Sequence, residues 1–398
     1  MDWTELEKKY YAPVYDRLPV TLVRGQGMHV WDDQERRYLD FTAGVAVLSL
    51  GHCHPVLVKA IADQAAILVH ASNAFYTIPQ LELAKLLVEH SAFQKVFFCN
   101  SGAEANEAAV KLARRYGHLH LDGAYEVITA IGSFHGRTLA MVAASGQEKF
   151  QKPYAPLPAG FVNVAYDDLE AIKGATTSRT CAIMLEPVQG EGGVNVPHPD
   201  YLQKVRAWCD ENGLLFILDE VQTGIARTGH LFAYQHSAVT PDIITLAKGL
   251  ASGMPIGAML ATDRASVFAL GEHGSTFGGN PLACAAGHAV LEYIIAHDLA
   301  RYAQEMGERL IAGLEKLKKE HGFITQVRGR GLLLAVEFDH ECAYPMVRAC
   351  LERGLLVNKV KPNAIRLMPP LILTSGDAEE ALDILADALG QVEASREP

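Results

Sequence analysis

Short apolar runs alternate with helix-like patterns along the chain from about residue 55 to residue 290. The runs are apolar throughout, as is typical of strands that are buried on both faces. Strands are predicted at 95–100, 125–133, 181–187, 213–220, 241–247 and 255–262. We therefore expect an α/β fold in which helices cover a mostly parallel sheet.

Two stretches between these runs have the apolar spacing of helices. The first, 104–117, ends on Gly117, and glycine is a common residue just after the last turn of a helix. The second covers 200–213 and also ends on a glycine. Both are predicted to pack against the sheet.

The two ends of the chain have a different pattern. Apolar and polar residues alternate over 28–41, which predicts a hairpin, but a hairpin alone has too little core to be stable. A long amphipathic helical region, about 289–320, precedes two more strand-rich stretches near the C-terminus. We predict a large domain at 55–290 and a smaller, discontinuous α+β domain made of 1–54 and 291–398.

Composition narrows the class of protein. Of 398 residues, 49% are hydrophobic and 20% are charged, which is typical of a soluble globular protein. The net charge of −11, with no block of lysine and arginine, argues against nucleic acid or an anionic membrane as a partner. The seven dispersed cysteines, the absence of a long apolar run and a polar N-terminus predict a cytoplasmic protein with reduced thiols.

The stretch "FFCNSGAEANEAA" places Ser101, Gly102 and Ala103 between a predicted strand and a predicted helix. Backbone N–H groups at the start of a helix attract anions, so these residues are candidates for binding a phosphate. Taken alone, the same pattern also fits a serine cap followed by a glycine turn.

Two further candidates follow apolar strands. Asp219 and Glu220 come after "LLFIL", at the strand end where open α/β sheets bind ligands, although a carboxylate there also fits a turn or a cap. Lys248 follows "DIITLA" and has only small or apolar neighbours. A desolvated lysine has a lowered pKa and forms Schiff bases with carbonyls, whereas an exposed lysine at a strand end has no such chemistry.

A phosphate cradle, an acid for a pyridinium nitrogen and a Schiff-base lysine are together the three contacts that pyridoxal phosphate requires. The chain resembles the class III pyridoxal-phosphate aminotransferases, of PLP-dependent transferase fold type I (aspartate-aminotransferase-like), over nearly its whole length. The resemblance rests on "GHCHP" (51–55), "NSGAEANEAA" (100–109), "FHGRT" (134–138), "EPVQGEGG" (186–193), "LDEVQTGIARTG" (218–229), "LAKGL" (246–250), "STFGGNP" (275–281) and "IRLMPPL" (365–371).

The resemblance implies roles for the three candidates. Lys248 would carry the cofactor and later move a proton, and Asp219 would keep the pyridine nitrogen protonated. Gly102 and Ala103 would bind the phosphate through their backbone, with Ser101 beside them.

Four further cofactor contacts are implied in the same way. Phe134 would stack on the ring, and Val221 and Gln222 would lie in the turn that contacts it. Thr276 would reach the phosphate of a neighbouring subunit, so the resemblance also implies a homodimer with shared active sites.

The resemblance implies substrates as well: an amino acid as donor and 2-oxoglutarate as acceptor. Arg137 and Arg366 match the arginines that bind substrate carboxylates, which suits the bidentate guanidinium. Glu191 matches an acid that pairs with the second arginine in relatives acting on a terminal amine, and Ser275 matches a contact to the donor. Which arginine binds which carboxylate is left open.

Alternatives remain at this point. An aminomutase of the same fold, or a transaminase of the class with another donor, would have the same residues, and a binding protein could retain the fold without the activity. No metal site is expected, because His52, Cys53 and His54 of "GHCHP" have no distal partners. The glycine-containing stretches "RGQG" and "VRGRG" lack the strand–helix context of a dinucleotide fingerprint.

Overall fold

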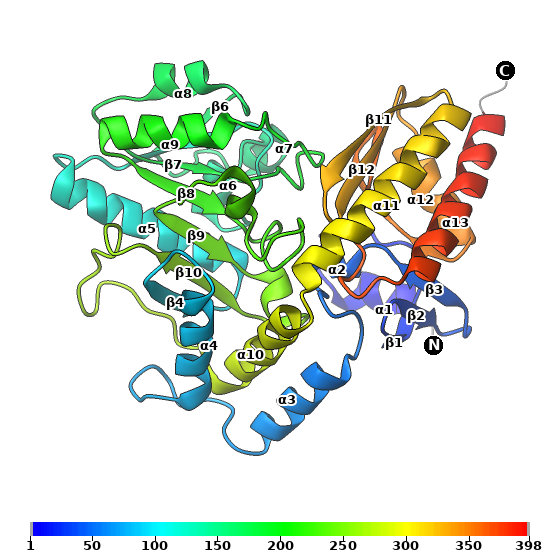
Figure 1. The fold of residues 1–398 in the computed structure, drawn as a ribbon, viewed down its shortest axis with the longest axis horizontal. Coiled ribbons are helices and arrows are strands. Elements are labelled where there is room, and N and C mark those ends of the chain that lie inside the picture. The colour runs from blue at the N-terminus through cyan, green and yellow to red at the C-terminus, as the bar shows by residue number, and fades with distance from the viewer. Residues whose placement is uncertain (1–2, 396–398) are drawn as a thin grey trace.

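A seven-stranded sheet lies at the centre of the larger lobe in the computed structural model, which describes residues 3–395 (Figure 1). Its order is β4-β10-β9-β8-β7-β5-β6. The strands are β4 (Lys95–Cys99), β5 (Glu126–Ala130), β6 (Phe161–Val164), β7 (Thr180–Leu185), β8 (Leu215–Asp219), β9 (Ile243–Leu246) and β10 (Gly257–Ala261). Neighbours from β9 to β6 are parallel, and β10 is antiparallel to β9 and β4. All six predicted strands and the mostly parallel sheet are confirmed, and β6 was not predicted.

Helices cover both faces of this sheet. Along β8, Leu215 and Ile217 pack in the cluster that includes α5, whereas Phe216 and Leu218 pack in the cluster that includes α9. This alternation is the two-residue period of a strand that is buried on both sides. The helices of this part of the chain are α3 (Pro55–Ala65), α4 (Ile78–Glu89), α5 (Gly102–His120), α6 (Leu139–Ala144), α7 (Glu148–Gln151), α8 (Leu169–Ala175), α9 (Tyr201–Asn212) and α10 (Pro281–Ala296), with short 3₁₀ turns η1 (Lys152–Tyr154), η2 (Ala233–Ser237) and η3 (Lys248–Ala251).

The two predicted helices end differently. α9 ends at Asn212 and is closed by Gly213, whose φ of 69° is left-handed, as glycine allows. The predicted end of the other helix at Gly117 is wrong, because α5 continues to His120. A Cβ on Gly117 would lie 2.0 Å from the carbonyl oxygen of Ala124 and 2.7 Å from Cys181 Cβ. Gly117 is therefore required by close packing and not by a helix end.

Gly117→Ala is expected to destabilise the protein by about 3 kcal/mol, because the added Cβ would clash with the backbone carbonyl of Ala124, which cannot move aside as a flexible side chain could. The matched control is Gly390→Ala in the last helix, where an added Cβ meets nothing within 4 Å. There alanine should stabilise by about 0.5–1 kcal/mol, through its higher helix propensity. Denaturant unfolding of both variants measures the difference, and equal effects would contradict this account of Gly117.

The smaller lobe contains two four-stranded sheets that combine both ends of the chain. One has the order β1-β2-β3-β13 and contains the predicted hairpin. Its β3 pairs in parallel with β13, so N-terminal and C-terminal segments share a sheet. The other has the order β11-β12-β15-β14. The strands are β1 (Leu22–Gln26), β2 (His29–Asp32), β3 (Arg37–Asp40), β11 (Ile324–Arg330), β12 (Leu333–Phe338), β13 (Leu355–Leu356), β14 (Asn358–Lys361) and β15 (Ala364–Leu367).

The helices outside the large sheet are α1 (Trp3–Tyr10), α2 (Ala43–Ala46), α11 (Leu299–Glu320), α12 (Ala343–Glu352) and α13 (Ser375–Ala394). The single amphipathic region predicted at 289–320 is instead two helices, because α10 ends at Ala296 and α11 begins at Leu299. Asp298 separates them with a φ of 48°. The division into domains at 55–290 and at 1–54 with 291–398 stays a prediction.

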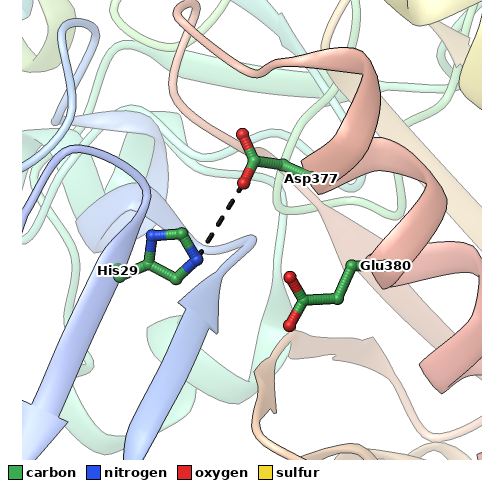
Figure 2. A group of neighbouring side chains, drawn as sticks. All are labelled: His29, Asp377 and Glu380. Carbon is green, nitrogen blue, oxygen red and sulfur yellow. Dashed lines mark ion pairs between the residues drawn. The ribbon is translucent and has the colours of Figure 1, made fainter.

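The last helix also touches the N-terminal sheet through a small polar cluster (Figure 2). His29 Nε2 lies 3.9 Å from Asp377 Oδ1, and Glu380 lies next to both. The other oxygen of Asp377 accepts a hydrogen bond from Thr374 N at 3.0 Å, and Glu380 is paired with Arg37. Because both carboxylates already have partners, we interpret the cluster as a link between β2 and α13.

All seven cysteines are free thiols, and only Cys53 is exposed. Over residues 3–395, no helix is at once long enough and apolar enough to cross a membrane.

Candidate active site

A cavity of about 390 Å³ opens at the carboxyl ends of β8 and β9. Its lining includes Gly102, Asp219 and Lys248, so the three candidates from separate stretches of sequence meet in one place. The volume is in the range of small-molecule and cofactor sites, and the position is where open α/β sheets bind ligands.

The N-terminus of α5 forms one wall of this cavity. Ser101 caps the helix by accepting a hydrogen bond from Glu104 N at 3.2 Å. The next two residues, Gly102 and Ala103, begin the helix and line the cavity. A Cβ on Gly102 would lie 2.7 Å from Val221 Cγ1, which explains the glycine. Ser101 thus caps the helix while the first N–H groups of the same helix remain suited to binding an anion.

Asp219 ends β8 and is almost fully buried, with its carboxylate held by three groups. Oδ2 accepts from Asn106 Nδ2 at 2.7 Å and lies 2.8 Å from His135 Nδ1, while Oδ1 accepts from Val221 N at 3.0 Å. Burial acts to lower the pKa of His135, but the hydrogen bond and charge of Asp219 outweigh it and raise that pKa. The network fixes Asp219 as a hydrogen-bond acceptor at the wall of the cavity.

Sequence reasoning did not single out Asn106 or His135. Both stand inside motifs that were recognised, "NSGAEANEAA" and "FHGRT", one helical turn or one residue from assigned positions. Glu220, the other acid after β8, turns away and accepts from the backbone N–H of Tyr234 at 2.8 Å. Of the two neighbouring acids, Asp219 lines the cavity.

Lys248 begins η3, two residues after the end of β9, and has a φ of 36°. Burial lowers the pKa of its ammonium group, although the nearby charges of Glu191 and Asp219 act in the opposite direction. A lowered pKa increases the fraction of neutral amine, the form that attacks a carbonyl. Gly249 is small because a Cβ there would lie 2.5 Å from Ser49 Oγ.

Glu191, in the wall of the cavity, forms an ion pair with Arg366, which is fully buried. Glu191 Oε1 lies 2.7 Å from Arg366 Nη1, and Gln222 Oε1 accepts from the same Nη1 at 3.1 Å. Arg366 Nε donates to Asn358 Oδ1 at 2.9 Å, while its buried Nη2 has no hydrogen-bond partner among residues 3–395. Burial raises the pKa of Glu191, but the charges of Arg366 and Lys248 bring it below its usual value.

A second buried acid, Glu186, lines the cavity beside His135 and was not assigned from sequence. Its carboxylate accepts from Phe134 N at 3.0 Å and from Gly190 N at 3.1 Å. Burial raises the pKa of Glu186 to about 7. The residue joins the predicted ring-stacking position, Phe134, to the turn that carries Glu191.

Arg137 is exposed at the mouth of the cavity, where its guanidinium lies 4.0 Å from the centroid of the Phe150 ring. Ser275 and Thr276 line a neighbouring hollow instead of this cavity. Ser275 Oγ accepts from Asn100 Nδ2 at 3.2 Å, and Thr276 is exposed. The other predicted site residues line the cavity, except Arg366, which is paired with Glu191 of that lining.

Both histidines of the "GHCHP" segment form hydrogen bonds. His52 Nε2 lies 2.9 Å from Asp40 Oδ2, and His54 Nδ1 accepts from Val56 N at the start of α3. Both imidazoles therefore take part in hydrogen bonds that fix the local backbone and side chains.

Comparison with known proteins assigns the family. The family model "Aminotransferase class-III" matches residues 10–389. The acetylornithine aminotransferase of Caldanaerobacter subterraneus subsp. tengcongensis is 52% identical over 387 residues, 97% of this chain and 98% of that protein. The enzyme of the same name from Methanocaldococcus jannaschii is 48% identical, covering 98% of each chain. The chain belongs to the class III aminotransferases.

Solved structures agree on the fold. An ornithine aminotransferase from Toxoplasma gondii has a TM-score of 0.96 and 35% identity, covering 99% of this chain and 96% of that one. The acetylornithine aminotransferase from Elizabethkingia anophelis has a TM-score of 0.86 and 36% identity, covering 98% of each. The predicted fold class and the aminotransferase assignment are confirmed.

Class III aminotransferases use pyridoxal phosphate, and the residues in the cavity fit this cofactor. The start of α5 offers backbone N–H groups for a phosphate, Asp219 offers a carboxylate for a protonated ring nitrogen, and Lys248 offers an amine for the aldehyde. A donor set of this kind, with one acid and one lysine at separate walls, suits an organic cofactor better than a metal ion.

Proposed function

We propose that this protein transfers the terminal amino group of N2-acetyl-L-ornithine to 2-oxoglutarate, which yields N-acetyl-L-glutamate 5-semialdehyde and L-glutamate. Two relatives with about half of their residues identical have the name of that activity. The stretches 70–80 and 273–287 of the sequence favour the same subfamily. The reaction would serve arginine synthesis in the cytoplasm.

The Glu191–Arg366 ion pair is the observation that carries the proposal, because a transaminase must accept two different substrates in one cavity. While Glu191 occupies Arg366, the site favours a donor whose reacting amine is far from its carboxylate. When Glu191 leaves, Arg366 offers a bidentate site for a carboxylate beside the reacting carbon of 2-oxoglutarate. Among residues 3–395 the buried Nη2 of Arg366 has no hydrogen-bond partner, and it would supply the second bond in this state.

The other residues have roles that follow from their positions. When bound, pyridoxal phosphate supplies a ring that accepts the electron pair left as the substrate C–H bond breaks. Lys248 Nζ takes up that proton and returns it to a carbon. Asp219 holds a proton on the ring nitrogen, and Gly102 and Ala103 donate backbone N–H groups to the phosphate. Ser275 is proposed to contact the donor.

Phe134, Val221 and Gln222 are proposed to enclose the cofactor ring, since all three line the cavity. Gln222 also bonds both members of the ion pair, because its Nε2 donates to Glu191 Oε1 at 3.3 Å. It therefore connects the cofactor turn to the carboxylate site. Arg137 at the mouth is positioned to hold the distal carboxylate of a substrate.

Steady-state kinetics with 2-oxoglutarate and a series of amines test the donor. We expect kcat/KM to be highest for N-acetylornithine, above ornithine, succinylornithine, 4-aminobutyrate and the lysine-pathway amine. A large preference for an unacetylated amine would reject the assignment of the donor but not the class of reaction.

Two controls separate the remaining alternatives. Product formed without any keto acid would identify an aminomutase, which regenerates its own amine. Native protein that is colourless and free of cofactor would identify a binding protein. The expected result is a coloured protein that turns over only when a keto acid is present.

We further propose that the active form is a homodimer in which Thr276 completes the neighbouring site. Apolar side chains are exposed over 67–78, including Ile67 at 76%, Phe75 at 70% and Tyr76 at 94%. Several large apolar side chains exposed along one short segment are typical of an interface. Mixing Lys248→Ala subunits with Thr276→Val subunits should form hybrid dimers that contain one intact site. Activity that does not recover on mixing would contradict the shared site.

A further inference from the structure

The "VRGRG" stretch places Arg328 in β11, facing the turn that carries Glu191. The register of the sheet determines where this arginine points. Arg328 is paired with Ala335 on β12, and Ala335 is paired with Arg366 on β15. Paired residues on adjacent strands project to the same face of a sheet. Arg328 and Arg366 therefore lie in one row of one face, separated by a small alanine.

Both arginines of this row hold the turn 190–194. Arg366 binds the side chain of Glu191 at 2.7 Å. Arg328 Nε donates to the carbonyl oxygen of Gly193 at 2.9 Å, two residues further on. The turn is closed by a bond from Gly193 N to the carbonyl oxygen of Gly190 at 3.3 Å, and Gly193 has a φ of 121°.

Arg328 is itself held rigidly. Its side chain is only 9% exposed and its Nη1 lies 2.5 Å from Glu337 Oε2, with Gln326 Oε1 at 2.8 Å. Ala335 and Val194 belong to the same buried cluster, which packs the turn against this face of the sheet. A rigid donor on the sheet therefore fixes the backbone from which Glu191 extends.

We propose that Arg328 is a positioning residue for Glu191, and that it sets the balance between the paired and the released state of Arg366. The inference rests on the proposed function. Without Arg328 the turn is less ordered, so Glu191 occupies Arg366 for a smaller fraction of the time. The half-reaction with the terminal amine, which needs the pair, becomes slower, whereas the half-reaction with 2-oxoglutarate does not.

Arg328→Gln tests the proposal. We expect the ratio of kcat/KM for N-acetylornithine to kcat/KM for 2-oxoglutarate, each measured as a half-reaction, to fall about tenfold, the loss typical of one charged hydrogen bond. Arg348→Gln is the matched control, since it removes the same charge from the exposed face of α12 and should leave the ratio unchanged. Should Arg328→Gln fold poorly, Arg328→Lys keeps one donor and is expected to give an intermediate ratio. An unchanged ratio in a folded Arg328 variant overturns the proposal.

A double-variant cycle distinguishes positioning from general damage. In a Glu191→Gln background, Arg328→Gln should change the ratio no further, because the residue acts through Glu191. An equal fall in both backgrounds overturns the proposal. The binding of glutarate, an unreactive dicarboxylate, gives a second readout by calorimetry: its Kd for the holoenzyme should stay the same or decrease in Arg328→Gln. A large increase in Kd would mean that Arg328 binds substrate directly, and would also overturn it.

A wrong assignment of the donor would give a different result from a wrong role for Arg328. If the wild-type enzyme prefers another terminal amine, the donor assignment falls, and the ratio is measured with that amine instead. The glutarate measurement needs no donor, so it tests Arg328 in either case.

Discussion

Lys248→Ala is expected to lower kcat by at least about a thousandfold while the protein stays folded. In the proposed function, Lys248 Nζ is both the amine that meets the cofactor aldehyde and the group that moves the proton, so both functions would disappear together. The side chain points into the cavity and contributes little to the core. Single-turnover rates with glutamate or the donor, together with circular dichroism, measure the two halves of this prediction.

Lys204→Ala is the matched control, because Lys204 is an exposed lysine on α9 that is paired with Asp200. Its loss removes the same charge and should leave kcat unchanged. Retention of more than a few per cent of wild-type turnover by Lys248→Ala would contradict the assignment of the lysine.

The same substitution has a signature in the cofactor-free protein. Burial lowers the pKa of Lys248 below its ordinary value of 10.5, so the folded protein binds fewer protons than the unfolded chain between the two pKa values. In that window the free energy of unfolding rises with pH, and the cost of burying Lys248 is gone above 10.5. Wild-type apoprotein should therefore gain stability relative to Lys248→Ala as the pH rises toward 10.5, and a parallel pH dependence of the two proteins would contradict a depressed pKa.

The large sheet and the candidate site were predictable for one physical reason. Strands that are buried on both faces must be apolar along their whole length, which makes them visible in sequence. Polar residues directly after such strands, such as Asp219 and Lys248, gather at one edge when the strands are parallel. Local sequence therefore carried enough information to predict these parts of the site.

The side chains that hold these site residues in place come from distant segments of the chain. Asn106 and His135 reach Asp219 from α5 and from the segment before α6, and neither has a local pattern that marks a polar network. Gly117 looks like a helix end in sequence, although its absent side chain makes room for Ala124. Arg328 hydrogen-bonds Gly193 in the turn that carries Glu191, although the two residues are 135 positions apart in the sequence. Such contacts are set by tertiary packing, which periodicity cannot show.

Asp219→Asn is expected to lower kcat by about a thousandfold. Two opposite charges about 4 Å apart interact by about 4 kcal/mol at an effective dielectric constant of 20, and each 1.4 kcal/mol is a factor of ten in rate. Asparagine keeps the shape of the side chain but cannot hold a proton on the ring nitrogen. It also turns an NH₂ group toward Asn106, His135 or Val221, which all donate to Asp219.

Glu220→Gln is the matched control for this change, because it makes the same carboxyl-to-amide substitution at the adjacent residue, where burial raises the pKa of the carboxyl to about 8. Glu220 is directed away from the cavity and accepts backbone N–H groups of Ala233 and Tyr234. Its loss should affect stability more than catalysis, so kcat measured on folded enzyme should change less than about tenfold. If the two variants lose equal turnover, replacing either buried carboxyl by an amide damages the enzyme in the same way, and Asp219 has no specific role at the ring nitrogen. A loss confined to Asp219→Asn, which persists at saturating cofactor, shows that its carboxylate acts in the chemical step and not only in binding.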